Sequence, residues 1–144
     1  MITESSKEPT TRLLLAIVMV MLIGCAPSNI ARSSCESILL ATGDAWSCTV
    51  KGDVVGQPSS ISFSTESRNQ VAQVSITLRV TKGTLRVGYQ NLAGEQHLLV
   101  TPSEPADLAM QTRMHRVHRS FILFFEPVDG AVEGLTGTVK YSTP

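Results

Sequence analysis

The strongest constraint on the fold of this chain is a strict alternation of apolar and polar side chains between residues 70 and 82. Successive side chains of a β-strand point to opposite faces, so a period of two over this length indicates a strand with one buried side. The segment therefore predicts a strand that covers an apolar core. Its inward positions are Ala72, Val74, Ile76, Leu78 and Val80.

The same pattern continues along the chain. After Gly83 the alternation resumes between Leu85 and Tyr89. Two alternating segments joined by a short connection with a glycine are typical of a β-hairpin, so we expect these two strands to pair. A second turn at residues 91–95 precedes a short strand at residues 97–101.

Further segments with strand-like patterns lie at residues 37–42, 45–50, 61–64, 117–125 and 135–141. About eight strands with turn residues at close intervals, and no long helical period, predict an all-β fold. We expect an antiparallel β-sandwich that resembles the jelly-roll sandwiches of secreted bacterial modules, with a small β-barrel as the alternative.

Two of these segments carry a further feature. Residues 117–125 are apolar on both faces toward their end, where Ile122 and Phe124 oppose the bulkier side, so we expect this part of the strand to be buried on both sides. Gly137 lies inside the last predicted strand, which indicates either a β-bulge or a close approach of a neighbouring backbone.

Ahead of these strands, residues 13–23 form an unbroken apolar run of eleven residues. A helix that spans the bilayer hydrocarbon needs about 20 residues, so the run is too short to span. An apolar run of this length, preceded by Lys7 and Arg12, is typical of the apolar middle of a secretory signal peptide.

The four residues that close this run are Leu22, Ile23, Gly24 and Cys25, and they resemble the lipobox of bacterial lipoproteins. The resemblance implies that lipoprotein signal peptidase recognises the first three residues and cuts before Cys25, which carries a diacylglycerol as the new N-terminus. Ala26 follows the cysteine where a retention signal would place Asp. The protein is then expected at the outer membrane of a two-membrane organism, or on the outer face of the cell membrane otherwise.

Lipidation of Cys25 would leave Cys35 and Cys48 as a pair among the three cysteines. In an oxidising compartment we expect a disulfide that closes a loop of about 14 residues and contributes roughly 3 kcal/mol. Free or zinc-bound thiols are the alternative, although no further cysteine completes a familiar ligand set. Trp46 shares its side of the strand with Cys48, so we expect it to pack inward; a solvent-facing Trp would instead offer a platform for a sugar.

Cleavage before Cys25 divides the chain into a signal peptide at residues 1–24, a lipidated tether at residues 25–34 and a β-sandwich at residues 35–144. The remaining length suits one domain. Lys and Arg together balance Asp and Glu, with twelve of each in the chain. Nucleic-acid-binding domains carry a clustered basic excess, so we expect no nucleic-acid partner.

The most unusual local stretch is basic and runs from residue 111 to residue 119. As a strand it would disperse its cations over both faces, whereas a helix would gather the arginines on one face. We expect a solvated strand edge whose charges are partly paired with nearby acidic residues; the alternative is a site for anionic lipid head groups or acidic glycans. The candidate residues are Arg113, His115, Arg116, His118 and Arg119.

No catalytic or metal-binding constellation is recognisable in the sequence. His115 and His118, three residues apart on a strand, would lie about 10 Å apart on opposite faces, so we predict no metal site. Gly-x-Ser-x-Gly, His-Glu-x-x-His and glycine-rich phosphate loops do not occur, and we expect no cofactor. The sequence therefore favours a non-catalytic structural or protein-interaction module of the cell envelope; a glycan- or polyanion-binding module is the alternative, and an envelope hydrolase is a third.

Overall fold

The computed structural model describes residues 29–40 and 43–143, so the predicted signal peptide, the lipobox and Cys25 lie outside the described residues. Within the described ranges there is no helix, and hence none long and apolar enough to cross a membrane. These residues form nine strands: β1 (Arg32–Leu40), β2 (Gly43–Val55), β3 (Ser59–Ser64), β4 (Val71–Arg79), β5 (Leu85–Asn91), β6 (Gly94–Val100), β7 (Ala106–Arg113), β8 (Ser120–Pro127) and β9 (Val132–Thr143).

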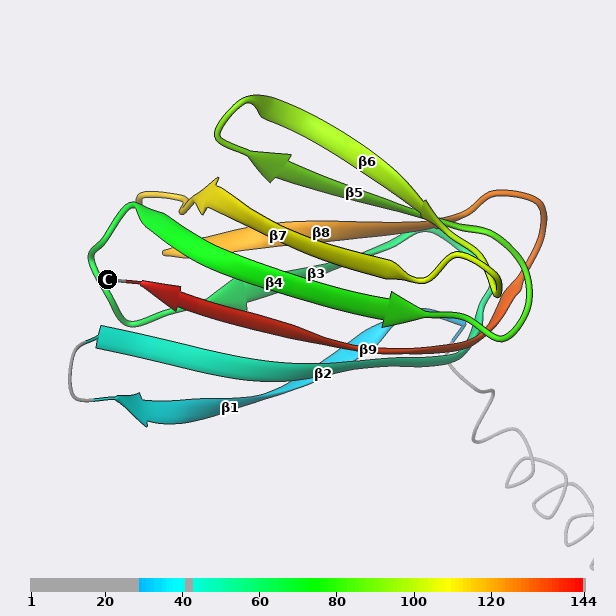
Figure 1. Cartoon of the computed structure of the whole chain (residues 1–144), viewed down its shortest axis with the longest axis horizontal. Coiled ribbons are helices and arrows are strands. Elements are labelled where there is room, and N and C mark those ends of the chain that lie inside the picture. Colours follow the sequence, from blue (N-terminus) through cyan, green and yellow to red (C-terminus); the bar gives the residue numbers. More distant parts are fainter. Residues whose placement is uncertain (1–28, 41–42, 144) are drawn as a thin grey trace, which may run out of the picture.

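The strands form two sheets that pack face to face (Figure 1). The five-stranded sheet has the order β1-β2-β9-β4-β7 and the four-stranded sheet the order β3-β8-β5-β6, with every pair antiparallel. Eight strands divided in this way make a jelly roll, to which β1 adds one edge strand. The predicted antiparallel β-sandwich is confirmed, and the chain does not form the alternative barrel.

The core lies between the two sheets, and the alternation in β4 supplies part of it. All five predicted inward residues of that segment are buried, and so are the inward residues of β8 in the other sheet. Burial of side chains of this size is the main stabilising contribution to such a fold, at about 25 cal/mol for each Å² of apolar surface. The largest fully buried side chains include Phe63, Ile76, Leu78, Leu123, Phe125 and Leu135.

The predicted hairpin between residues 70–82 and the next strand is wrong. β4 pairs with β7 on one side and β9 on the other, while β5 belongs to the opposite sheet and pairs with β6 and β8. Both edges of β4 are therefore occupied, and the connection crosses between sheets at Gly83, whose φ of 86° is accessible to glycine. The predicted turn at residues 91–95 does join a hairpin, because Asn91 pairs with Gly94 between β5 and β6.

Several strand boundaries also differ from the prediction. β1 begins at Arg32, inside the segment predicted as a tether, and β2 continues past Val50 to Val55. β7 was not predicted, and the strand expected from residue 117 begins only at Ser120. The residues between β7 and β8 form a turn, which places residues 114–119 of the basic stretch in a loop, whereas Arg113 is the last residue of β7.

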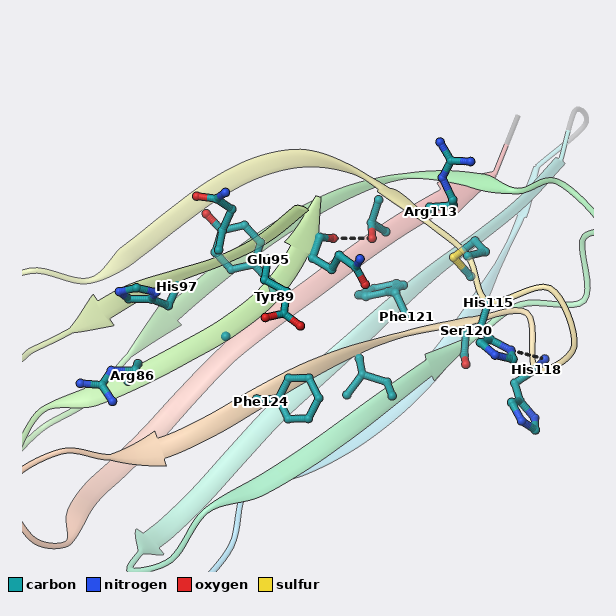
Figure 2. A pocket seen from close by; sticks show the side chains of 16 residues that line it. Arg86, Tyr89, Glu95, His97, Arg113, His115, His118, Ser120, Phe121 and Phe124 are labelled. Carbon is teal, nitrogen blue, oxygen red and sulfur yellow. Dashed lines mark hydrogen bonds between the residues drawn. The ribbon is translucent and has the colours of Figure 1, made fainter. Parts of the chain in front are cut away.

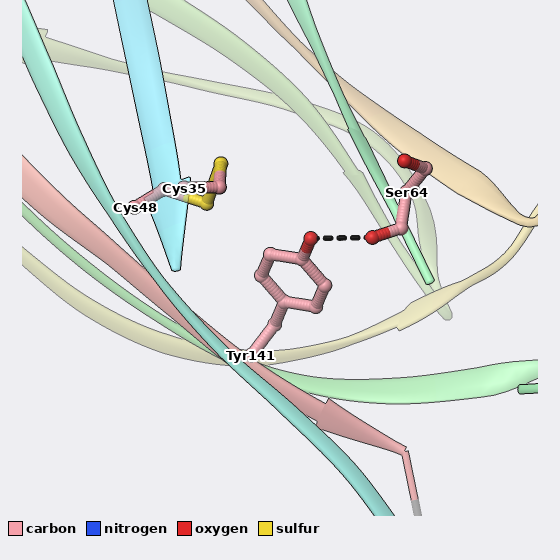
Figure 3. Close-up of a disulfide and its surroundings, with 4 residues drawn as sticks. All are labelled: Cys35, Cys48, Ser64 and Tyr141. Carbon is pink, nitrogen blue, oxygen red and sulfur yellow. Dashed lines mark hydrogen bonds between the residues drawn. A yellow bond between two sulfur atoms is a disulfide. The ribbon is translucent and has the colours of Figure 1, made fainter. Parts of the chain in front are cut away.

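The Cys35–Cys48 disulfide joins β1 to β2, in which the two cysteines lie directly opposite each other with 4.0 Å between their Cα atoms (Figure 3). Trp46 is partly buried against the core, as predicted, and its ring lies 6.4 Å from that of Tyr141. The hydroxyl of Tyr141 in β9 donates a hydrogen bond to the carbonyl of Ser64 in β3, which links the two sheets.

The arrangement of β5 and β8 positions the candidate site. These strands pair only from Leu85 to Gly88, and beyond Gly88 no further pairs join them. The β5–β6 hairpin then diverges from β8 (Figure 1) and approaches β7, where the Thr112 hydroxyl donates to the Gln90 carbonyl over 2.6 Å. The divergence opens a cleft between β5 and β8 on the outer side of the four-stranded sheet.

Candidate functional site: the β5–β8 cleft

The β5–β8 cleft has a volume of about 1030 Å³ and runs along the outer face of the four-stranded sheet (Figure 2). Its floor reaches the core because the two strands separate above Thr112, Met114 and Phe121, all of which are buried. β5 and β6 form one wall, β8 forms the other, and the turn after β7 closes one end. The lining residues are Arg86, Gly88, Tyr89, Gln90, Glu95, Gln96, His97, Thr112, Arg113, Met114, His115, His118, Ser120, Phe121, Ile122 and Phe124.

Phe124 is the most exposed large apolar side chain that lines the cleft. It lies opposite Gly88 in the β5–β8 pair, and a Cβ placed on Gly88 would be 3.4 Å from the Phe124 Cβ. The glycine therefore leaves the neighbouring strand without a side chain beside Phe124. Phe124 is 55% exposed and Ile122 is 43% exposed, so the expected burial of this strand on both faces is wrong. The outer face of β8 presents a rigid aromatic side chain to solvent.

Polar groups surround this aromatic surface. His97 pairs with Gly88 across the β5–β6 hairpin, so it lies in the same row of the sheet as Phe124. At the same end, Arg86 donates to the Glu126 carboxylate over 2.9 Å. Glu95 lies farther along the same β5–β6 wall, beside Tyr89 (Figure 2). The cleft thus offers both hydrogen-bond donors and acceptors around an apolar centre.

The turn after β7 brings the two predicted histidines together. Their rings stack with centroids 4.8 Å apart, and His115 Nδ1 accepts hydrogen bonds from the backbone N–H groups of Val117 and His118 at 3.3 and 3.2 Å. The expected separation of about 10 Å on opposite faces of a strand is therefore wrong. The reason is local, because the chain turns at residues 116–118 instead of continuing as a strand.

The structure distributes the predicted basic residues over two neighbouring sites. Arg113, His115 and His118 line the β5–β8 cleft. Arg116 and Arg119, again with His115, line a smaller pocket of about 230 Å³ next to it. The salt bridges found within residues 29–40 and 43–143 are Lys82–Glu133 and Arg86–Glu126, so the expected ion pairing of the basic stretch does not occur there.

Several residues of the two sites were not predicted from the sequence. Phe124 and Ile122 were assigned to the interior, and Arg86, His97 and Glu95 had no distinguishing local pattern. Arg68 lies far from the basic stretch in sequence but lines the same small pocket. Among the residues that the structure describes, no three His, Cys, Asp or Glu side chains gather in a way that would hold a metal ion.

Comparison with known proteins identifies no family. No protein-family model and no curated protein matches this chain. Among solved structures, PRD1 vertex protein P5 has a TM-score of 0.47 and 8% identity, covering 78% of this chain and 95% of the other. A chain of the disulfide-linked pili of Bacillus endospore appendages has a TM-score of 0.41 and 11% identity, covering 83% and 94%. The CBM22-1 xylan-binding domain of Paenibacillus barcinonensis Xyn10C has a TM-score of 0.39 and 16% identity, covering 78% and 83%. These distant likenesses assign no activity to the chain.

Proposed function

We propose that this chain is a non-catalytic, lipid-anchored binding module of the cell envelope that holds a carbohydrate chain in the β5–β8 cleft. The observation that carries the proposal is the exposed Phe124, which lies beside Gly88 within an open cleft. Large apolar side chains that remain exposed inside a cleft are typical of binding sites.

The chemistry of the cleft suits a sugar better than a purely apolar ligand. A sugar ring has an apolar face, which can pack against an aromatic ring, and a rim of hydroxyls, which need donors and acceptors. Phe124 supplies the first, and Gln90, Glu95 and His97 supply the second. The volume is at the upper end of the range for small-molecule sites, which reaches about 1,000 Å³, and the cleft is open enough to admit a chain of sugars.

The proposed location rests on the cysteines. The Cys35–Cys48 disulfide is compatible with an oxidising compartment outside the cytoplasm. The lipobox residues before Cys25 support attachment through a lipid, for which two or more acyl chains give stable membrane binding. The proposal therefore places a glycan-binding surface in the envelope, where polysaccharides are abundant.

The test is a screen of neutral and acidic envelope polysaccharides, followed by calorimetry with the best binder. Phe124→Ala should weaken binding about tenfold or more, because an aromatic contact with its burial is worth roughly 1.5 kcal/mol or more. The matched control is Leu92→Ala, which removes a side chain of similar exposure (48%) from the β5–β6 turn, outside the cleft. Equal affinities of wild type and Phe124→Ala, or no binding by any polysaccharide, would contradict the proposal.

A protein partner is the second candidate, and Leu99 favours it. This residue is 50% exposed and lies opposite Arg86, so it extends the apolar surface beyond the cleft. A protein that covers the whole outer face should lose affinity in both Leu99→Ala and Phe124→Ala. A glycan confined to the cleft should respond to Phe124→Ala alone.

A further inference from the structure

A second pocket adjoins the β5–β8 cleft at its basic end. We call it the arginine pocket, because its charged side chains are Arg68, Arg116 and Arg119. None of the described residues that line it is acidic. His115, Asn69 and Gln70 add further polar groups to the lining. Like charges gathered around one small volume favour the binding of an anion there.

Two loops form this pocket, and backbone hydrogen bonds hold them together. The backbone N–H of Met114 donates to the Gln70 carbonyl over 2.7 Å, which ties the turn after β7 to the loop between β3 and β4. The backbone N–H of Thr65 donates to the Arg119 carbonyl over 3.0 Å. These bonds hold the loop of Arg68 beside the turn that carries Arg116, and both residues line the pocket.

Arg119 adds a sign of functional constraint. Its φ is 48°, in the left-handed region that side chains other than glycine rarely adopt. Its backbone N–H donates to the His115 carbonyl over 2.7 Å, and its guanidinium donates to the Glu66 carbonyl over 2.9 Å. Unfavourable backbone conformations of this kind concentrate at functional sites, where the surrounding structure maintains them.

We propose that the arginine pocket binds the acidic group of the glycan whose sugar rings occupy the β5–β8 cleft, which makes the ligand an acidic polysaccharide. This inference rests on the proposed function. Guanidinium groups match the geometry of carboxylate, sulfate and phosphate oxygens through paired N–H donors. Met114 and His115 line both the cleft and the pocket, so the two sites are adjacent, and on this proposal one chain of sugars extends from the cleft to the pocket.

The first experiment tests the pocket without any sugar. The full chain in a neutral detergent is titrated with sodium sulfate at constant ionic strength, and NMR follows the amides of residues 65–70 and 114–120. We expect saturable shifts in these two loops. Arg68→Ala/Arg116→Ala should weaken sulfate binding about tenfold or more. Lys51→Ala/Arg79→Ala, which removes the same charge from the five-stranded sheet, should bind sulfate like wild type.

Two outcomes of this titration would overturn the inference. One is the absence of saturable shifts in wild type, and the other is unchanged sulfate affinity in Arg68→Ala/Arg116→Ala. A charge-retaining variant, Arg68→Lys/Arg116→Lys, separates a shaped site from a general positive field. We expect it to recover only part of the affinity, because an ammonium group lacks the paired donors of guanidinium; complete recovery would contradict a shaped site.

The second experiment connects the pocket to the cleft by comparing dextran sulfate with neutral dextran. Wild type should bind dextran sulfate about tenfold more tightly, and the difference should disappear in Arg68→Ala/Arg116→Ala but persist in Lys51→Ala/Arg79→Ala. A difference that persists in the first variant would overturn the inference. If Phe124→Ala changes neither affinity while the sulfate effect remains, the carbohydrate cleft fails and the anion pocket stands. Binding to phosphatidylglycerol vesicles, with no response to dextran sulfate, would assign the pocket to lipid head groups instead.

Discussion

At the scale of single residues, Tyr141 is the clearest link between the two sheets. Its ring meets Phe121 and Phe63 edge-on, with centroids 5.2 and 6.1 Å apart, and its hydroxyl donates to the Ser64 carbonyl. Burial disfavours the charged phenolate and raises the pKa of Tyr141 from 10.0 to about 12. The side chain therefore couples the stability of the sandwich to alkaline pH.

We predict that the free energy of unfolding falls as pH rises from 10 to about 12. In this window the unfolded state loses the Tyr141 proton while the folded state keeps it, so the contribution is complete below pH 10 and is lost as pH rises through the folded pKa. The loss is on the order of 2 kcal/mol. Urea denaturation at several pH values measures it, with Tyr141→Phe as the matched control. Equal pH slopes for the two proteins would contradict the prediction.

The close packing around Gly137 leads to a second prediction at the scale of single residues. The pairing of β9 continues through Gly137 on both sides, so the residue marks a close approach and not a bulge. A Cβ at this position would collide with the Thr77 carbonyl oxygen and lie 2.7 Å from a Leu78 methyl. Gly137→Ala should therefore destabilise the fold by about 1–3 kcal/mol. Thermal denaturation measures the change, and Gly56→Ala, whose nearest neighbour would be 3.5 Å away, is the control. An unchanged melting temperature of Gly137→Ala would contradict this close approach of the neighbouring strand.

At the scale of elements, the disulfide determines how firmly β1 is held. β1 pairs only with β2 and forms the edge of the five-stranded sheet, and the cross-link spans a sequence separation of 13. Reduction should lower the free energy of unfolding by roughly 3 kcal/mol and accelerate amide exchange most strongly in β1. The same reductant should have no effect on Cys35→Ser/Cys48→Ser. Unchanged exchange in β1 after reduction would show that the strand does not depend on the disulfide.

The predictability of these elements depends on the range of the interactions that define them. The period of two in β4 is a local property, so the buried face of this strand can be predicted from its own sequence. The pairing partners of β4 cannot be predicted in this way, because β7 and β9 come from distant parts of the chain and take the place of β5 in the expected hairpin. β7 escaped prediction because its inward residues are not uniformly apolar: Ala106 is small and Thr112 is polar, although both are buried.

The same limit applies to the candidate site. The sequence alone identifies the residues of the basic stretch as candidates. Their arrangement depends on the turn after β7, and the prediction of a continuous strand left no place for that turn. Phe124 resembles a core residue in sequence, but it lies on the outer face of β8, which none of the residues that the structure describes covers with a further layer. Arg68 and Arg116 line the same pocket because backbone hydrogen bonds hold together two loops that are remote in sequence.

At the scale of the whole molecule, the described N-terminal end and the basic end of the cleft lie at opposite ends of the sandwich (Figure 1). The carbonyl of Asn29 accepts a hydrogen bond from Gly56 at the β2–β3 turn, whereas His115 and Arg116 lie on the turn between β7 and β8 at the far end. If Cys25 carries the lipid, we expect the proposed binding site to face away from the membrane, toward polymers of the envelope.

The lipid attachment itself makes a prediction for the whole chain. Protein purified from the membranes of a bacterium with lipoprotein-processing enzymes should lack residues 1–24 and carry a diacylglycerol on Cys25. Intact-mass spectrometry measures both changes, and Cys25→Ser should show neither. Retention of residues 1–24 together with an unmodified Cys25 thiol would contradict the proposed anchoring.

The most direct test of the binding account is NMR mapping of the full chain with the polysaccharide that binds best. The account predicts that perturbed amides cluster along the β5–β8 cleft, at residues 86–90, 95–97 and 120–124, and extend to the turn at residues 113–119. Perturbations confined to the outer face of the five-stranded sheet, around Thr49, Thr77 and Thr138, would contradict it.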